Sequence, residues 1–210
     1  MKFHYGRLAA GALLVAATAL LGSAEQANAT TTTITFGTND GLVDGVYHLG
    51  ATYTEQGYTF SSALGDLVTW GNGQSADPDP TDSVSLIGYH PLDAITLTRS
   101  DGGVFDLTSI DFQGYVGALN PGDGLLNFTW VFANGLTGSG SDLIRHDSWT
   151  TELFSLQGLR SFTWQPASSD LNWAWADNVT VVATTPIPAA LPLFMSGLGA
   201  LGFVRLRRKA

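Results

Sequence analysis

Oxygen-bearing side chains gather near the two ends of the central part of the chain, in a pattern that suits a hard cation. Asp40 and Asp44 follow the first expected strand, and Asp177 and Asn178 fall in the last one. The first and last strands of a β-sandwich are often neighbours, which would bring these four side chains together. Ca²⁺ takes about six to eight oxygen ligands of this kind. The sequence therefore predicts a calcium site here, with the alternative that Asp177 and Asn178 hydrogen-bond a neighbouring turn.

The six tryptophans are the other side chains that could bind a ligand. Flat aromatic rings can cover the apolar faces of sugars, although in β-proteins they more often fill the core. Trp130 and Trp164 lie on alternating segments whose apolar positions point inward, so we expect both in the core. Trp149 and Trp173 each follow a polar segment. We expect these two to be the ligand-binding aromatic residues.

Residue types that serve catalysis are sparse in this sequence. His48, His90 and His146 are dispersed, and their spacing fits neither a zinc site nor a catalytic triad. His146, Asp147 and Ser148 have the composition of a triad, but adjacent residues cannot converge on one reacting atom. A polysaccharide hydrolase would need two carboxylates facing one cleft. We therefore expect no enzyme activity, and keep a hydrolase as the remote alternative.

The charge balance excludes one class of partner. Residues 30–185 hold 17 of the 18 acidic residues and three of the nine basic ones, a formal charge of −14. Nucleic-acid binding needs clustered Lys and Arg against the phosphates, so we expect no nucleic-acid partner. The chain has no Cys and therefore no disulfides. Its stability has to come from a hydrophobic core, which a domain of this length can supply.

Short segments with alternating apolar and polar residues recur between residues 30 and 183, separated by clusters of Gly, Asn, Asp and Pro. This alternation predicts strands of an antiparallel sheet with one buried and one wet face. A dozen short strands favour two packed sheets, an all-β antiparallel β-sandwich of jelly-roll-like type. The expected strands are residues 32–36, 46–53, 58–61, 67–70, 83–87, 94–98, 104–107, 109–116, 126–133, 151–154, 161–164 and 174–182.

The first 29 residues have the three parts of a secretory signal peptide. Lys2 and Arg7 supply a positive start, residues 8–22 are apolar, and Ala27 and Ala29 are the small residues of a signal-peptidase site. We expect cleavage after Ala29. Signal peptidase is thus a predicted partner, and residues 1–29 take no part in the predicted fold.

The end of the chain carries a proline motif, an apolar stretch and a basic cluster, in that order. The motif is Pro186-Ile187-Pro188-Ala189, and residues 187–204 are apolar. As a helix they would reach about 27 Å, enough for a thin bilayer, so we predict a transmembrane helix. Basic residues after such a helix stay on the cytoplasmic side and stop its transfer. The residues of this membrane stop are Arg205, Arg207, Arg208 and Lys209.

This three-part segment, residues 184–210, resembles the PEP-CTERM sorting signal, in particular its Val-Pro-Leu-Pro-Ala variant. The resemblance implies a Gram-negative exopolysaccharide producer, in which an exosortase-type transpeptidase processes an inner-membrane-anchored precursor near the Pro-x-Pro motif. Ile187 replaces the Glu of the commoner motif and Thr185 the Val of the variant, so the processing enzyme is left open. The segment is also known as an ice-binding protein C-terminal domain, but we expect no flat array of Thr in the rest of the chain.

The last predicted strand carries a second, shorter resemblance. Residues 175–181 are similar to the final strand of many secreted jelly rolls of the carbohydrate-binding-module kind. We thus expect a signal peptide (1–29), a β-sandwich domain (30–183) and a sorting signal (184–210). The predicted function is that of an exported, non-catalytic cell-surface or extracellular-matrix protein associated with exopolysaccharide in a biofilm. The alternatives are a calcium-stabilised carbohydrate-binding module and, more remotely, a polysaccharide hydrolase.

Overall fold

Antiparallel β-strands make up the regular structure of the computed structural model in the part of the chain that it describes, residues 29–36, 46–70, 84–115, 123–146, 148–167 and 171–183. These residues belong to one compact unit, Ala29–Thr184. The prediction of an all-β antiparallel fold is confirmed, and the jelly-roll-like connection order stays a prediction. The strands are β1 (Thr30–Ile34), β2 (Val46–Gly50), β3 (Thr52–Glu55), β4 (Tyr58–Ser62), β5 (Leu67–Trp70), β6 (Ser85–Gly88), β7 (Ile95–Arg99), β8 (Phe105–Tyr115), β9 (Gly124–Phe132), β10 (Thr137–Ile144), β11 (Thr150–Pro166) and β12 (Trp173–Ala183).

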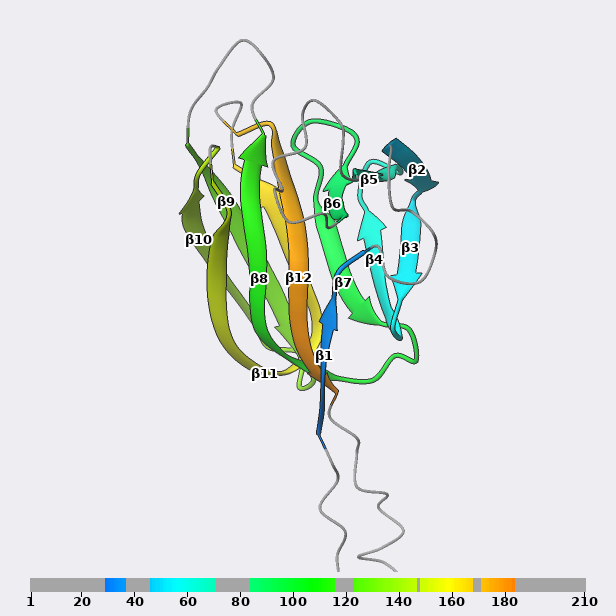
Figure 1. Ribbon diagram of the computed structural model, residues 1–210. Helices are drawn as coiled ribbons and strands as arrows, with labels where there is room; N and C mark the ends of the chain where they lie inside the picture. Colours follow the sequence, from blue (N-terminus) through cyan, green and yellow to red (C-terminus); the bar gives the residue numbers. More distant parts are fainter. Residues whose placement is uncertain are drawn as a thin grey trace, which may run out of the picture. The chain divides into compact units, whose positions relative to one another are not determined.

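The strands are hydrogen-bonded into one sheet that folds back on itself into two layers (Figure 1). The order is β2-β5-β6-β12-β8-β11-β7-β4-β3, with β1 beside β12 and β9 between β10 and β11. The long strand β11 belongs to both layers, because its first part pairs with β8 and its last part with β7 and β9. We call β1, β2, β5, β6, β8 and β12 the first layer. The second layer consists of β3, β4, β7, β9, β10 and the last part of β11.

Strand β11 can pass from one layer to the other because its pairing with β8 is irregular. The register shifts between Leu153 and Leu156 and again between Leu156 and Leu159. Extra residues on one strand bend it and increase its twist. Gly158 has φ 68°, a conformation that glycine adopts without strain. Its N–H donates to the Asp106 carboxylate at 2.7 Å, which ties the bend to β8.

The hydrophobic core lies between the two layers. Phe112 of β8 contacts both Trp164 of β11 and Phe128 of β9, each with ring centroids 5.7 Å apart. Phe36, after β1, contacts Phe60 of β4 at 5.0 Å. All five rings are buried, and half-buried Trp130 packs against the same core, as expected. Aromatic side chains of this size dominate the stabilisation, since truncating one typically costs about 3–5 kcal/mol.

The structure differs from the predicted strands in three places. The predicted strand 46–53 is two strands, because Gly50 adopts φ 77° and the chain turns there. Two pairs of short predicted strands are each one long strand, β8 and β11. Strand β10 was not predicted, because the segment from Thr137 to Asp142 is a run of Gly, Ser and other polar residues without an apolar alternation.

The outer face of the second layer shows a feature that no sequence pattern indicated. Two rows of outward positions across six strands hold Thr or Ser at eleven of twelve places, so an array of hydroxyl side chains is present. The rows of this array run across the strands, so neighbouring residues in a row belong to different strands. No periodicity along the chain could show them. The sheet twist, about 20–25° per strand, keeps the array from being flat.

The first and last strands are neighbours, with Thr30 opposite Ala183. Both ends of the described domain therefore leave from one end of the two-layer structure, the lower end in Figure 1. The signal-peptidase residue Ala27, the predicted cation ligands Asp40 and Asp44, and residues 184–210 lie outside the described residues. Within the described ranges, no helix has the length and apolar character that a membrane crossing requires.

Candidate functional site

Four of the six tryptophans gather on the outer face of the first layer, away from the core. Trp175 is the centre of this tryptophan cluster and is 1% exposed, although it points outward from the sheet. Trp70, Trp149 and Trp173 are half-buried and pack around Trp175 together with the aliphatic side chains of β5 and β6. Trp70 meets Trp175 edge to face, with ring centroids 5.2 Å apart. The three outer indoles present the cluster to solvent.

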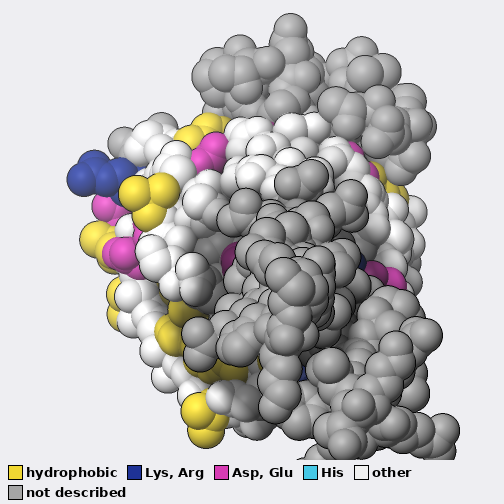
Figure 2. Space-filling model, turned by 90° about the horizontal axis from the view of Figure 1, so that it is seen from below, with side chains coloured by type: hydrophobic (Ala, Val, Ile, Leu, Met, Phe, Trp, Pro, Cys, Tyr) yellow, Lys and Arg dark blue, Asp and Glu magenta, His cyan; other side chains and the backbone are white. Residues whose placement is uncertain are grey.

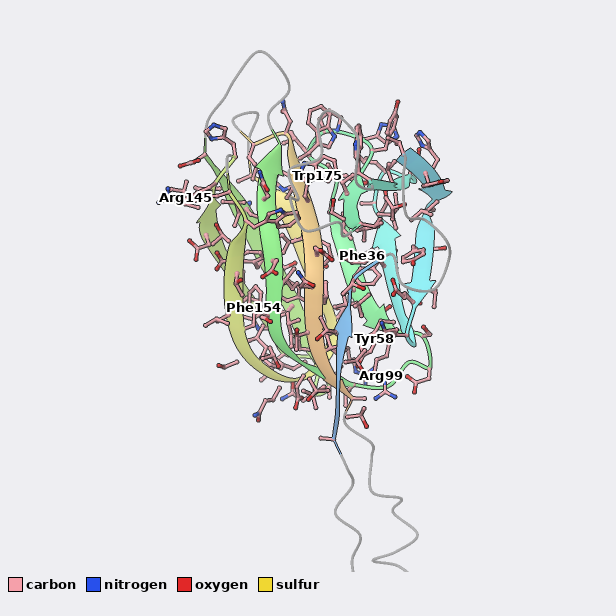
Figure 3. All side chains as sticks on the ribbon, viewed as in Figure 1. Phe36, Tyr58, Arg99, Arg145, Phe154 and Trp175 are labelled. Atoms are coloured by element: carbon pink, nitrogen blue, oxygen red, sulfur yellow. The ribbon has the colours of Figure 1, made fainter. Side chains whose placement is uncertain are left out.

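The strand register explains why these residues meet. Val68, Ile87, Trp175 and Gln113 lie opposite one another on β5, β6, β12 and β8, as the pairs on either side of them show. Side chains alternate between the two faces of a strand, so Trp173 and Trp175 share one face of β12 while Ala174 and Ala176 face the core. Figure 3 places Trp175 on the upper part of β12.

Hydrogen bonds hold the polar surroundings of the cluster. The Trp173 indole N–H donates to the Tyr89 carbonyl at 3.1 Å, and the Gln113 amide donates to the His146 carbonyl at 3.1 Å, which fixes the segment before Trp149. The indole nitrogens of Trp70 and Trp149 and the amide oxygen of Gln113 are buried, and they have no hydrogen-bond partner among the described residues.

An exposed rim of His48 and Tyr89 adjoins the cluster. The Tyr89 side chain is 51% exposed and its ring meets the His48 ring edge to face at 4.7 Å. The His48 Nδ1 lies 2.7 Å from the Asp66 carboxylate. The sequence analysis missed these residues, because Tyr89 lies in a turn after β6 and only the register of β2 with β5 brings His48 beside it. The arrangement combines flat apolar surface with a few polar groups, as small-molecule and sugar sites do.

The predicted ligand-binding residues Trp149 and Trp173 are brought together in this cluster, on segments 24 residues apart in the sequence. Each is half-buried rather than fully exposed. Trp130 and Trp164 lie on the other side, against the core. The expectation that Trp130 and Trp164 belong to the core is confirmed, and the ligand-binding role of Trp149 and Trp173 stays a prediction.

Two of the four predicted calcium ligands lie in the described residues. Asp177 is buried on β12, and its carboxylate accepts the Asn178 N–H at 2.7 Å. The Asn178 amide donates to Asp111 at 2.9 Å, and Thr151 donates to the other oxygen of Asp111 at 2.6 Å. Asn178 has φ 48°, a conformation that Asn tolerates better than most residues. These contacts link β12, β8 and β11, and calcium binding stays a prediction.

One pair of carboxyl groups shares a hydrogen bond. Glu152 on β11 bonds Asp142 on β10, and burial, this hydrogen bond and the nearby charge of Asp142 raise the pKa of Glu152 to about 7. The pair therefore holds a proton near neutral pH. A glycosidase needs carboxyl groups about 5 to 9.5 Å apart to accommodate the sugar and a nucleophile. A directly bonded pair does not fit that geometry.

Other acidic side chains accept hydrogen bonds at the turns and loops. Asp93 is buried and accepts hydrogen bonds from the Ser62 hydroxyl at 2.5 Å and the Leu64 N–H at 3.0 Å. Asp123 accepts from both the ring and the backbone N–H of His146, which lowers the pKa of Asp123. Figure 2 shows acidic side chains at several places around the lower end of the domain. Among the residues that the structure describes, no three His, Asp or Glu side chains form a group that could hold a metal ion.

Comparisons with known proteins give likenesses of fold. No family model and no curated protein matches the chain. Among solved structures, it is similar to a mutant of a family 29 carbohydrate-binding module, with 17% identity over 76% of this chain and 96% of that one, at a TM-score of 0.39. It is also similar to the family 32 carbohydrate-binding module of NanJ from C. perfringens in complex with galactose. That likeness has 11% identity over 64% of this chain and 100% of that one, at a TM-score of 0.40.

Proposed function

We propose that this protein is an exported, non-catalytic surface or matrix protein whose β-domain binds extracellular polysaccharide through the tryptophan cluster. The observation that carries the proposal is the position of the cluster. Four indoles lie on the outer face of a sheet, where they are not needed to fill the core between the layers. A separate aromatic surface of this kind suits the flat, apolar faces of pyranose rings.

The polar groups around the cluster suit the same ligand. Sugar hydroxyls both donate and accept hydrogen bonds, and the accessible polar groups at the rim of the cluster are the His48 ring and the Asp66 carboxylate, which lie 2.7 Å apart. His48 and Tyr89 add a further ring surface beside it. A binding surface with aromatic anchors and a few placed polar groups gains both affinity and orientation.

Export and sorting rest on the two ends of the chain. The signal-peptide features up to Ala29 and the PEP-CTERM-like residues 184–210 support an inner-membrane-anchored precursor that reaches the cell surface or matrix of a Gram-negative bacterium. Signal peptidase and an exosortase-type transpeptidase are the partners this requires. Thr30 and Ala183 are register partners, while Trp175 lies about eight residues, roughly 26 Å of strand, from Ala183. The cluster is thus far from the attachment end of the domain.

The hydrogen bonds that the carboxylates make within the domain disfavour the hydrolase alternative. Glu152 and Asp142 share a hydrogen bond with each other, and Asp111 accepts from Thr151 and Asn178. None of these acids belongs to the tryptophan cluster. We therefore assign the domain a binding role.

Replacing Trp149 or Trp173 by Leu tests the binding role. Leu keeps apolar volume but removes the flat ring, so we expect polysaccharide binding to weaken by about tenfold or more, as at other aromatic anchors. Affinity electrophoresis through gels containing cellulose derivatives, mannan or xylan, with calcium present, measures this. Phe154→Leu is the control, because Phe154 is also a partly buried aromatic residue but packs against the core. Equal binding by all three variants, or no retardation of the wild type in any gel, would contradict the assignment.

Deleting residues 186–210 tests the sorting part. We expect the truncated protein to escape membrane anchoring and processing, and to appear at full truncated length in the periplasm or medium. Fractionation and mass determination of the chain in a producing host measure this. An Arg205→Gln, Arg207→Gln, Arg208→Gln and Lys209→Gln variant is the control that removes only the membrane stop. If location and processing were the same with and without the segment, the sorting role would be refuted.

A further inference from the structure

The outer face of the second layer carries two rows of side chains that each cross six strands. The first row runs over β10, β9, β11, β7, β4 and β3, and the second runs parallel to it, two residues away on each strand. Eleven of the twelve side chains bear a hydroxyl, and we call this surface the hydroxyl face. The first row is Ser139, Thr129, Thr163, Thr96, Ser61 and Thr52, and the second is Thr137, Val131, Ser161, Thr98, Thr59 and Thr54.

Contacts between neighbouring strands hold the hydroxyl groups in place. Thr96 and Thr163 hydroxyls lie 2.8 Å apart, and Thr54 and Thr59 hydroxyls 3.0 Å apart. A third contact joins Thr59 to the Ser100 hydroxyl at 3.1 Å. A hydroxyl has one donor and two acceptor positions, so each of these groups keeps hydrogen-bonding capacity after one such contact. The face is therefore a set of donors and acceptors, eight of which are on β-branched, rotationally restricted Thr side chains.

The charge pattern restricts what can bind this face. No acidic or basic residue occupies any of the twelve positions, although the domain is strongly acidic overall. An anionic polymer would find no Lys or Arg to pair with. Trp130 lines a recess of this face, but the twelve positions themselves offer a protein partner no aromatic or Arg anchor of the kind that dominates protein interfaces. A neutral ligand rich in hydroxyl groups is the chemical match.

The shape of the face also points to a chain-like ligand. A recess of about 390 Å³ lies over β9, β10 and β11, and six of the residues that line it belong to the rows: Thr129, Val131, Thr137, Ser139, Ser161 and Thr163. Strands are spaced about 4.8 Å apart, so each row is about 24 Å long and the two rows are roughly 7 Å apart. The twist of about 20–25° per strand excludes a match to a rigid planar lattice over this length. A flexible polymer can follow it.

We propose that the hydroxyl face is a second binding surface, on which a neutral, extended polysaccharide chain lies across the strands. Successive sugar residues would meet the hydroxyls of successive strands. The ligand class rests on the proposed function, but the surface belongs to the opposite layer from the tryptophan cluster and shares no residue with it. Two surfaces on opposite layers would let one molecule bridge two polysaccharide chains.

The test replaces Thr96, Thr129 and Thr163 together by Val, which keeps β-branching while removing three adjacent hydroxyls. We expect retention of insoluble cellulose and mannan to weaken by about tenfold or more, since the lost hydrogen bonds add. The loss should be the same at low and high salt, because no charge is involved. Thr31→Val, Thr33→Val and Thr180→Val together are the matched control, with the same chemistry on the first layer. We expect this control to bind like the wild type.

Comparison with the Trp149→Leu variant separates the two proposals. Normal binding by the face variant, with loss in Trp149→Leu, overturns the hydroxyl face and leaves the proposed function standing. Loss in the face variant, with normal binding by Trp149→Leu, supports the face and overturns the cluster as the glycan site. Failure of the wild type to bind any of these polysaccharides overturns both. Inhibition of ice recrystallisation by the wild type, lost in the face variant and without glycan binding, would assign the face to ice and overturn our inference.

Discussion

At the scale of single residues, the chemical behaviour of a side chain depends on its burial and hydrogen-bond partners as well as on its type. Glu152 is one of many acids, but its contact with Asp142 and its partial burial raise its pKa to about 7. Asn178 and Asp177 are adjacent in the sequence, yet the Asn178 amide reaches Asp111 on the next strand. Residue type and spacing could select Trp149 and Trp173 as surface aromatics. They could not show which partners each would meet.

The pKa of Glu152 predicts a pH dependence of stability. A carboxyl whose pKa rises on folding binds its proton more tightly in the folded state. The contribution to the free energy of unfolding is therefore fully present below about pH 4.5, the ordinary pKa of Glu, and is lost as the pH rises through about 7. We expect Glu152→Gln to remove this part of the dependence, so that the difference in melting temperature between variant and wild type changes between pH 5 and pH 8. A constant difference across that range would refute the raised pKa.

At the scale of elements, β10 shows how packing overrides local preference. Its run of Gly, Ser and polar residues carries no strand pattern, but the strand pairs with β9 over its whole length. Gly138 lies opposite Trp130, and a side chain at Gly138 would overlap the indole ring. The absence of a side chain is what lets the large ring lie across the strand. A local pattern therefore predicted β9 and not its partner.

Substituting the two glycines of β10 tests this packing. Gly138→Ala should destabilise the fold by about 1–3 kcal/mol, because the added methyl group overpacks against Trp130. Gly140→Ala is the control on the same strand. A Cβ added at Gly140 would lie 3.7 Å from the nearest atoms of the Trp130 ring, which is an ordinary van der Waals contact. We expect it to be neutral or slightly stabilising, since Ala has less freedom than Gly in the unfolded chain. Urea denaturation of both variants measures the difference, and equal effects would contradict the close packing.

At the scale of the whole molecule, the two proposed binding surfaces lie on different layers. Thr30 and Ala183, at the two ends of the described domain, lie side by side, while the tryptophan cluster lies on the upper part of the first layer (Figures 1 and 3). The hydroxyl face covers the outside of the second layer. A domain attached by its ends would thus present two different surfaces outward, one aromatic and one polar and uncharged.

Calcium binding would act on the stability of the whole domain. Asp177 and Asp111 are opposite each other on β12 and β8, and like charges in such positions repel. A cation between them would relieve this, so we expect the melting temperature to be higher in calcium than in chelator, as for any ligand that binds only the folded state. Asp177→Asn should reduce the calcium-dependent shift, whereas Asp101→Asn, in an exposed turn, should leave it unchanged. Identical melting curves in calcium and chelator would leave Asp177 and Asn178 with a structural role alone.

The sequence by itself determined the fold class and the inward or outward direction of most strand residues, because period-two alternation is a local property of each segment. It also separated the core pair Trp130 and Trp164 from Trp149 and Trp173. Only the tertiary structure decided which strands pair, how β11 joins the two layers, and that four tryptophans form one surface. The hydroxyl face could be recognised only in the tertiary structure, since each of its rows collects residues from six strands. Register between distant segments is set by the packing of the whole core, and no local pattern carries that information.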